Sequence, residues 1–358
     1  MTTAHPAPDA AHAAHPGAYA RLDPSRVLDA LDRVGLRGDG RVLQLNSYEN
    51  RVFQVYLEDG SAVVAKFYRP SRWSDAQILE EHGFALELAQ AEIPVVPPLA
   101  LTADPLVGTD PLTLHGTPPT LATWQADGQT HRFSVSPCRA GRSPELDDAH
   151  TLRWIGRFLG RIHAVGTTRP FQHRWTLDVA TFGDSARATL LEGEHIPADL
   201  REAWRRGCDD ALAAVRDAFD RAGPLRRLRL HGDCHRGNVL WTDEGPQFVD
   251  LDDAVNGPAI QDLWMLLAGD RHAMTRQLLD LLEGYEDFYD FDWRECALIE
   301  PLRTLRMIHH SAWIARRWQD PAFPAAFPWF GTPAFWTHEI QLLRDQLDAM
   351  REPPLGSA

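Results

Sequence analysis

The stretch from Leu228 to Asp253 constrains the fold of this chain more than any other. Two short apolar runs, residues 239–241 and 248–251, flank a Thr-Asp-Glu-Gly-Pro turn and predict a β-hairpin. Ahead of the hairpin, residues 231–238 are polar and contain two glycines, which predicts a loop between apolar ends. We therefore expect a rigid scaffold that presents a polar loop.

Three side chains with hard oxygen atoms lie in this scaffold: Asp233, Asn238 and Asp250. An aspartate, an asparagine five residues later and an aspartate at the end of the next strand are typical of phosphoryl transfer. One carboxylate meets the attacking hydroxyl, while the amide oxygen and the second carboxylate hold the Mg²⁺ that carries the nucleotide phosphates. The segment His-Gly-Asp-x-x-x-x-Asn keeps the Asp-to-Asn spacing of the kinase catalytic loop, with Gly in place of Arg.

Two other interpretations of the loop compete with phosphoryl transfer. A two-metal phosphoesterase also uses His, Asp and Asn ligands, but it needs an Asn-His pair, and the sequence contains none. Alternatively, an Asx-rich turn caps a hairpin, and Asp and Asn bond only to their own backbone. The N-terminal half of the sequence disfavours the second interpretation, because it supplies the remaining parts of a nucleotide site.

Length and composition set the bounds of the fold. A chain of 358 residues is long enough for about two domains, and 44% apolar with 24% charged residues is ordinary for a globular protein. The net charge of −14 argues against a nucleic-acid partner. No membrane-spanning run or signal peptide is apparent, so we expect a cytoplasmic protein. The four cysteines are scattered and predict neither zinc nor disulfides, and Cys234 is expected to be a bystander.

Lys66 is the only lysine among 36 Lys and Arg residues. It belongs to residues 62–67, the second strand of a hairpin predicted by Asp59-Gly60. Alternation places Val63, Ala65 and Phe67 on one face and Lys66 on the other. We expect its compact ammonium to reach the α- and β-phosphates of a nucleotide. The alternative is an edge-strand lysine that discourages aggregation.

Two further residues complete the expected nucleotide site. Ser47 lies in the polar turn 46–50, where protein kinases carry a glycine-rich loop, and its hydroxyl can contact phosphate oxygens. A turn without a ligand is the alternative. The helix expected from Ser74 to about Ala91 carries Glu80 and Glu81, either of which can pair with Lys66. We favour Glu81, because Phe84 three residues later shares its inward face.

The domain plan follows the change of pattern along the chain. Residues 1–20 read as a disordered tail, residues 21–138 as a β-rich nucleotide-binding lobe, and residues 139–358 as a mainly helical catalytic and substrate-binding lobe. Helices are expected at 147–165, 197–222, 260–267 and within 298–350. Asp262 either accepts N–H bonds from the catalytic loop or is an ordinary acidic residue at a helix N-terminus.

These segments resemble the kinase-like phosphotransferases of the aminoglycoside phosphotransferase and choline kinase branch. They are most similar to the stress response kinase A family of Ser/Thr protein kinases. The likeness is carried by several segments: Leu45-Asn-Ser-Tyr-Glu-Asn-Arg-Val52, Val64-Ala-Lys-Phe-Tyr-Arg-Pro70, Ile78-Leu-Glu-Glu-His82, Leu230-His-Gly-Asp-Cys-His235, Phe248-Val-Asp-Leu-Asp-Asp-Ala254 and Trp318-Gln-Asp-Pro-Ala-Phe-Pro324.

The resemblance implies a bilobal, protein-kinase-like α+β fold with a small β-rich lobe and a larger helical lobe. It implies that Asp233 is the proton acceptor, with Asp250 also catalytic, and that Asn238 and Asp250 are Mg²⁺ ligands. Ser47 and Lys66 would contact ATP. The implied partners are ATP and a protein Ser/Thr hydroxyl, with no nucleic acid or membrane, and we expect a monomer with a role in stress response. Asp-Leu-Asp in place of Asp-Phe-Gly, and the lack of a phosphorylatable activation segment, favour a constitutively assembled site.

Two other functions stay open at this point. A small-molecule kinase for an amino alcohol, aminoglycoside or homoserine-like substrate is compatible with Asp252 and Asp253, which can hold an ammonium group, although solvation explains them equally well. A nucleotide-binding regulator without catalysis is disfavoured, because every phosphoryl-transfer position holds a competent residue.

Overall fold

The computed structural model describes residues 22–102, 118–126 and 128–356. The expected tail at residues 1–20 lies outside this range. The chain forms two compact units, one made of the described residues up to Leu79 together with those from Leu99 to Cys138, the other of Glu80–Pro98 and the residues from Arg139 onward. A sheet-based unit and a mainly helical unit confirm the α+β class.

The first unit is built on an antiparallel sheet of five strands in the order β1-β2-β3-β5-β4. The strands are β1 (Gly38–Leu45), β2 (Arg51–Leu57), β3 (Ala62–Phe67), β4 (Ala122–Ala126) and β5 (Gln129–Pro137). The predicted hairpin at Asp59-Gly60 is confirmed as the β2–β3 pair, and β3 occupies the centre of the sheet.

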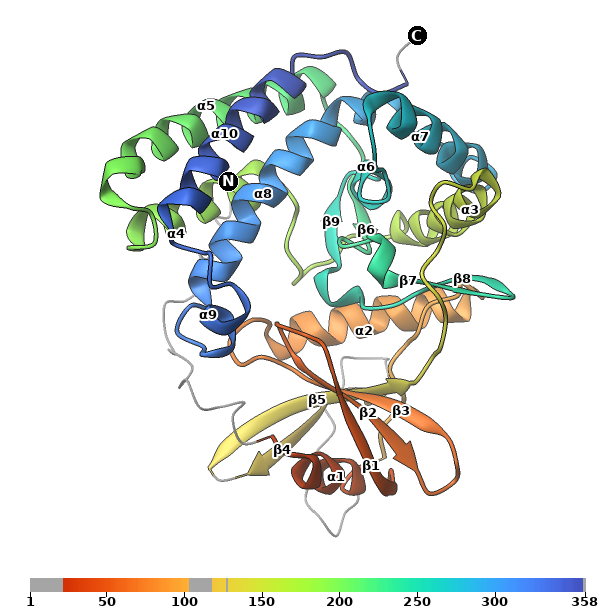
Figure 1. The fold of residues 1–358 in the computed structure, drawn as a ribbon. Coiled ribbons are helices and arrows are strands. Elements are labelled where there is room, and N and C mark those ends of the chain that lie inside the picture. Colours follow the sequence, from red (N-terminus) through yellow and green to blue (C-terminus); the bar gives the residue numbers. More distant parts are fainter. Residues whose placement is uncertain (1–21, 103–117, 127, 357–358) are drawn as a thin grey trace, which may run out of the picture. The chain divides into compact units, whose positions relative to one another are not determined.

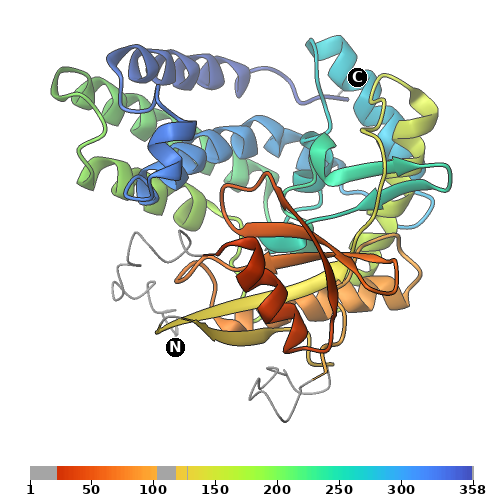
Figure 2. The same ribbon diagram turned by 60° about the horizontal axis from the view of Figure 1, so that its bottom comes forward.

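Helix α1 (Pro24–Asp32) covers one face of this sheet (Figure 2). The Asp23 carboxylate caps it by accepting the Arg26 N–H at 3.0 Å. The apolar stripe of Val27 and Leu31 is fully buried, in one core with alternate residues of β2 and β3. Amphipathic periodicity of the helix and alternation of the strands therefore form the core of the first unit.

Helix α2 (Asp75–Gln90) begins at a reciprocal capping box and continues into the second unit. The Gln77 N–H donates to the Ser74 hydroxyl at 3.3 Å, and the Ser74 N–H donates to the Gln77 side-chain oxygen at 2.9 Å. Two N–H groups that have no partner within the helix are thereby satisfied. The turn of α2 that carries Glu80 and Glu81 belongs to the second unit.

The second unit is mainly helical, and Figure 1 shows its helices packing in pairs, α5 with α10 and α3 with α7. Its α-helices are α3 (Ala149–Gly166), α4 (Ser185–Glu192), α5 (Ala198–Ala222), α6 (Ile260–Trp264), α7 (Arg271–Tyr285), α8 (Ile299–Arg316), α9 (Ala322–Ala326) and α10 (Pro333–Ala349). A π-helix, η1 (Val179–Asp184), precedes α4. The 3₁₀ helices among the described residues are η2 (Arg236–Asn238), η3 (Leu251–Asp253) and η4 (Trp293–Leu298).

Glycines bring α3 and α7 into close backbone contact. A Cβ added to Gly156 would lie 2.0 Å from the Leu281 carbonyl oxygen, and one added to Gly284 would lie 2.0 Å from the Arg153 carbonyl oxygen. No other residue fits at these two positions without moving a helix. The two helices are therefore held at a fixed separation.

Two short antiparallel pairs carry the predicted catalytic loop: β6 (Leu228–Leu230) with β9 (Val255–Gly257), and β7 (Val239–Thr242) with β8 (Gly245–Phe248). The hairpin was predicted, but its second strand begins earlier than expected. Gly245 pairs with Thr242 and adopts φ +110°, so the turn is shorter than Thr-Asp-Glu-Gly-Pro. The helix expected at 260–267 was also too long: α6 ends at Trp264, and Leu266 and Leu267 continue in i→i−3 turns.

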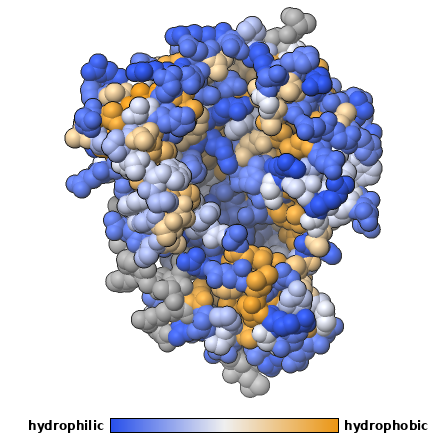
Figure 3. All heavy atoms as spheres, viewed as in Figure 1, coloured by the Kyte–Doolittle hydropathy of each residue, from blue (hydrophilic) through white to orange (hydrophobic). Residues whose placement is uncertain are grey.

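Aromatic side chains at residues 323–336 contribute to the core of the second unit. Phe323 and Trp336 are fully buried, and Trp329 remains 41% exposed. On the face shown in Figure 3, apolar residues reach the surface in separate patches among hydrophilic ones. Among the described helices, none combines the length and the apolar character that a membrane crossing requires.

Candidate active site

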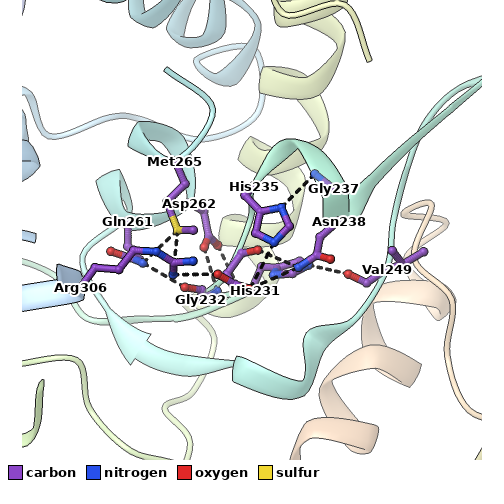
Figure 4. Close-up of polar contacts among 11 residues, drawn as sticks. His231, Gly232, His235, Gly237, Asn238, Val249, Gln261, Asp262, Met265 and Arg306 are labelled. Atoms are coloured by element: carbon purple, nitrogen blue, oxygen red, sulfur yellow. Dashed lines mark hydrogen bonds and ion pairs between the residues drawn. The ribbon is translucent and has the colours of Figure 1, made fainter. Parts of the chain in front are cut away.

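The catalytic loop between β6 and β7 is anchored by one buried carboxylate. Asp262 is fully buried, and its two oxygens accept the backbone N–H groups of His231 and Gly232, both at 2.8 Å. Gln261 lies in the same helix as Asp262, α6, and its side-chain amide donates to the Gly232 carbonyl at 2.9 Å (Figure 4). Of the two interpretations of Asp262, bracing of the catalytic loop is confirmed.

Gly232 explains why this loop has glycine where protein kinases have arginine. Its φ is +84°, and a Cβ at this position would lie 2.2 Å from the Asp253 carbonyl oxygen. Both the left-handed backbone and the close approach exclude a side chain. The loop is thereby pressed against the segment that follows Asp250.

A buried chain of polar groups fixes Asp262 in turn. His163 of α3 lies with Nε2 at 3.1 Å from Asp262 Oδ2 and with Nδ1 at 2.8 Å from the Tyr285 hydroxyl of α7. A carboxylate only accepts, so His163 Nε2 donates to Asp262, and a ring with its proton on Nε2 accepts from the Tyr285 hydroxyl at Nδ1. Burial raises the pKa of the Tyr285 phenol, which keeps this donor protonated. Hydrogen bonds from Tyr285 of α7 through His163 of α3 to Asp262 thus connect the α3–α7 contact to the catalytic loop.

Asp233 has polar neighbours at both carboxylate oxygens. Arg306 Nη1 of α8 lies 2.8 Å from Oδ1, and His235 Nε2 lies 3.5 Å from Oδ2. Asn238 Nδ2 lies 3.0 Å from the Asp233 carbonyl oxygen and 3.4 Å from Oδ2. Sequence reasoning missed Arg306, since α8 is far along the chain and no local pattern indicates which of its residues faces the loop.

The hairpin brings Asp250 beside Asn238. Val239 pairs with Phe248 at the end of the β7–β8 ladder, and the Val249 N–H donates to the Asn238 carbonyl at 3.0 Å. Asp250 was expected at the end of the strand, but β8 ends at Phe248, and Asp250 takes the left-handed conformation with φ 61°. This αL residue turns the chain into η3, which a regular strand cannot do.

The donor set of this site fits Mg²⁺. Because the Asn238 amide nitrogen faces Asp233, its oxygen Oδ1 is directed to the other side, where it can accept a cation. In the parts of the chain that the structure describes, no group of three or more His, Cys, Asp and Glu side chains is placed to hold a metal. Mg²⁺ is usually held by one or two carboxylates together with waters and substrate phosphates, so Asp250 with Asn238 is a suitable protein contribution.

Cys234 plays no chemical part in this loop. The side chain is fully buried, and burial raises the pKa of its thiol well above the ordinary value. A thiol in this state is neither nucleophile nor metal ligand. This agrees with its expected role as a bystander.

Lys66 and Ser47 belong to the first unit. Lys66 pairs across the sheet with Val52 on one side and Ser134 on the other, so it lies on a central strand. An edge-strand role is therefore excluded for Lys66. The Ser47 hydroxyl accepts the Asn50 N–H at 3.3 Å, so this residue closes a polar turn.

The two glutamates of α2 have different surroundings within the second unit. The Glu80 carboxylate accepts three backbone N–H groups, those of residues 172–174, at 2.5, 2.8 and 2.9 Å. Glu81 is only 7% exposed, and its Oε2 lies 3.7 Å from His82 Nε2 and 3.9 Å from Arg174 Nη2. Glu80 is therefore engaged with the backbone, and the pairing of Glu81 with Lys66 stays a prediction.

A sheet unit, a helical unit and a braced Asp-x-x-x-x-Asn loop define the class of a kinase-like phosphotransferase. Residues 41–299 match the phosphotransferase enzyme family. The structure resembles that of amicoumacin kinase hAmiN in complex with AMP-PNP, Ca²⁺ and Ami, with a TM-score of 0.70 and 19% identity over 96% of this chain and 97% of that one. It also resembles a microcompartment-associated aminopropanol kinase, with a TM-score of 0.66 and 16% identity over 92% and 96% of the two chains.

Proteins with similar sequences identify the family within this class. Stress response kinase A of Escherichia coli K12 is 42% identical over 337 residues, which are 94% of this chain and 96% of the relative. The serine/threonine protein kinase RdoA of Salmonella typhimurium matches with the same identity and coverage. The chain belongs to the stress response kinase A family, within the phosphotransferase enzyme family.

Proposed function

We propose that this phosphotransferase is an ATP-dependent protein kinase that transfers the γ-phosphoryl group of Mg·ATP to a serine or threonine hydroxyl. The observation that carries the proposal is the anchored loop, in which Asp262 fixes the backbone just before Asp233 and Asn238 bonds back to it. Support for a protein substrate comes from the 42% identity to a relative named as a serine/threonine protein kinase. The names of the relatives also support a role in stress response. We further propose that the enzyme acts in the cytoplasm as a monomer.

In the proposed reaction the substrate hydroxyl oxygen forms a bond to the γ-phosphorus, the bond to the β–γ bridging oxygen breaks, and ADP leaves. Asp233 orients the hydroxyl and accepts its proton. Asn238 Oδ1 and Asp250 would hold Mg²⁺, which would neutralise the charge of the phosphates. These groups are held in place before the reaction, and such preorganisation is the main source of the rate enhancement in phosphoryl transfer.

The nucleotide contacts are assigned to the remaining predicted residues. Lys66 binds the α- and β-phosphates, and Glu81 orients its ammonium group. Ser47 contacts the phosphates through its hydroxyl and the N–H groups of its turn. The central-strand position of Lys66 supports this role, since a charged side chain there does not serve to block a sheet edge.

A small-molecule kinase is the alternative. The similar solved structures include kinases named for amicoumacin and aminopropanol, but at 16–19% identity that likeness shows the fold alone. Asp252 was considered as a ligand for the ammonium group of a small-molecule substrate. Its side chain is only 4% exposed, so it is not an ordinary solvated surface residue. The alternative is therefore included in the test.

The test is phosphotransfer from labelled ATP to generic protein acceptors and, in parallel, to a panel of amino alcohols and aminoglycosides. We expect label in protein with wild type, and a kcat at least ~10²-fold lower for Asp233→Asn, which removes the proton acceptor but keeps the shape. Lys66→Ala and Asp250→Asn should lose transfer while remaining folded. Label in metabolites and never in protein would replace the proposal by its alternative. Near-normal transfer by Asp233→Asn would refute the catalytic assignment.

A further inference from the structure

An irregular segment of the second unit, residues 171–177, connects two parts of the proposed site. We call this segment the strap. It follows α3 and precedes η1 in the chain. On one side it bonds to the turn of α2 that carries Glu80 and Glu81, and on the other to the segment that follows Asp250.

Glu80 makes the bond on the α2 side. Its Oε1 accepts the Gln172 N–H at 2.5 Å, and its Oε2 accepts the N–H groups of His173 and Arg174 at 2.8 and 2.9 Å. Three successive backbone donors converge on one carboxylate, which is a strong, charge-assisted arrangement. The residue next to Glu80 is Glu81, so the strap fixes the backbone that carries Glu81.

Asn256 makes the bond on the other side. Its side chain accepts the Phe171 N–H at 2.8 Å and donates to the Phe171 carbonyl at 3.0 Å. Its backbone N–H donates to the Trp175 carbonyl, and its carbonyl accepts the Leu177 N–H, at 2.9 and 2.8 Å. The strap therefore runs along the β9 segment as an added strand would.

Arg174 joins both sides within the protein interior. Its side chain is fully buried, Nη1 donates to the Asp252 carbonyl at 2.6 Å, and Nη2 lies 3.9 Å from Glu81 Oε2. A buried guanidinium needs such partners, because its desolvation is costly. Arg174 thus links the Glu81 carboxylate to the backbone two residues after Asp250.

From this arrangement we infer that the strap is a permanent internal substitute for an activation segment, and that Glu80 is the positioning residue that anchors it. Glu81 and the Asp250 segment are thereby held in one geometry without a phosphorylation event. The inference rests on the proposed function, in which Glu81 and Asp250 have their roles. It gives a structural basis for the constitutively assembled site that the sequence indicated.

Glu80→Ala and the isosteric Glu80→Gln test the inference. Glu87→Gln serves as the matched control, since Glu87 lies on the same helix and pairs with Arg229 at 2.8 Å. We expect kcat to fall ~10²-fold in Glu80→Ala and less in Glu80→Gln, because small misplacement of reacting groups has effects of this size. The KM for Mg·ATP should rise as well, because Glu81 and Asp250 belong to the proposed nucleotide and Mg²⁺ site, and the control should keep the kcat and the KM of wild type. All assays are run well below each unfolding temperature, and Glu80→Gln carries the comparison if Glu80→Ala does not fold.

Amide hydrogen exchange supplies a second readout. Exchange should accelerate at residues 172–174 and also at 250–256 in both Glu80 variants, but not in Glu87→Gln. Faster exchange confined to 172–174, with kcat within about twofold of wild type, would overturn the inference. If wild type phosphorylates small molecules and no protein, the protein kinase proposal fails, and the same kcat comparison with that acceptor still decides the role of the strap.

Discussion

Replacing Glu295 by glutamine is expected to stabilise the protein at pH 8 and to leave its stability at pH 4 unchanged. Glu295 lies in η4, is 3% exposed, and accepts the Ile260 N–H at 2.9 Å at the start of α6, the helix that carries Asp262. Burial raises the pKa of its carboxyl from 4.5 to about 7. Glutamine keeps an acceptor oxygen and resembles the protonated acid, but it never ionises.

Proton linkage gives the sign and the size of the expected change in the free energy of unfolding. Because the pKa is raised in the folded state, the proton on Glu295 contributes stability in full below pH ~4.5, and this contribution is lost as the pH rises through about 7. A displacement from 4.5 to about 7, at about 1.4 kcal/mol per pH unit, amounts to about 3 kcal/mol. For a unit of this size that corresponds to roughly 6–12 °C in unfolding temperature.

Thermal unfolding of wild type and Glu295→Gln from pH 4 to 8.5 at constant ionic strength checks the prediction. The advantage of the variant should grow across the interval between pH ~4.5 and ~7.5. Glu244→Gln, which changes an exposed glutamate in the β7–β8 turn, controls for the loss of one charge. An advantage that does not vary with pH would refute the reasoning, since it would show that Glu295 does not titrate on unfolding.

Three further predictions concern the loop and its surroundings. Gly232→Ala should lower the free energy of unfolding by at least roughly 1–3 kcal/mol, measured by urea denaturation, because the left-handed φ alone costs this much and the 2.2 Å approach to a carbonyl oxygen adds to it; an unchanged midpoint contradicts this. Asp262→Asn should leave one buried N–H without an acceptor and reduce kcat ~10²-fold, so wild-type kinetics would argue against bracing. Iodoacetamide at pH 8 should modify Cys138 in the native protein and spare the three buried thiols, as read by mass spectrometry; rapid labelling of Cys234 would contradict its burial.

Local patterns in the sequence predicted much of the architecture and the loop. Alternation correctly placed Val63, Ala65 and Phe67 on the buried face of β3, and the spacing of Asp233 and Asn238 indicated one loop. Such features depend on residues close together in the chain, where periodicity and turn chemistry act. The role of Asp262 was predicted only as one of two interpretations, because an acidic residue at a helix N-terminus also interacts favourably with the helix dipole.

Contacts between distant helices were not predictable in this way. Arg306 reaches Asp233 from α8, and His163 meets Tyr285 only because glycines let α3 and α7 approach. Nothing in the spacing of single residues encodes which face of one helix meets another. The strap has the same origin, since Glu80 bonds to backbone groups more than 90 residues away, and backbone donors leave no trace in composition.

The single lysine, set in the middle of β3, has a practical use. A protease that cuts only after lysine has one site in the whole chain, and that bond lies within a strand paired on both sides. Cleavage therefore requires the sheet of the first unit to open, so the rate at which two fragments appear reports how often the sheet opens. Slower cutting in the presence of ATP would report nucleotide binding by the native, unlabelled protein.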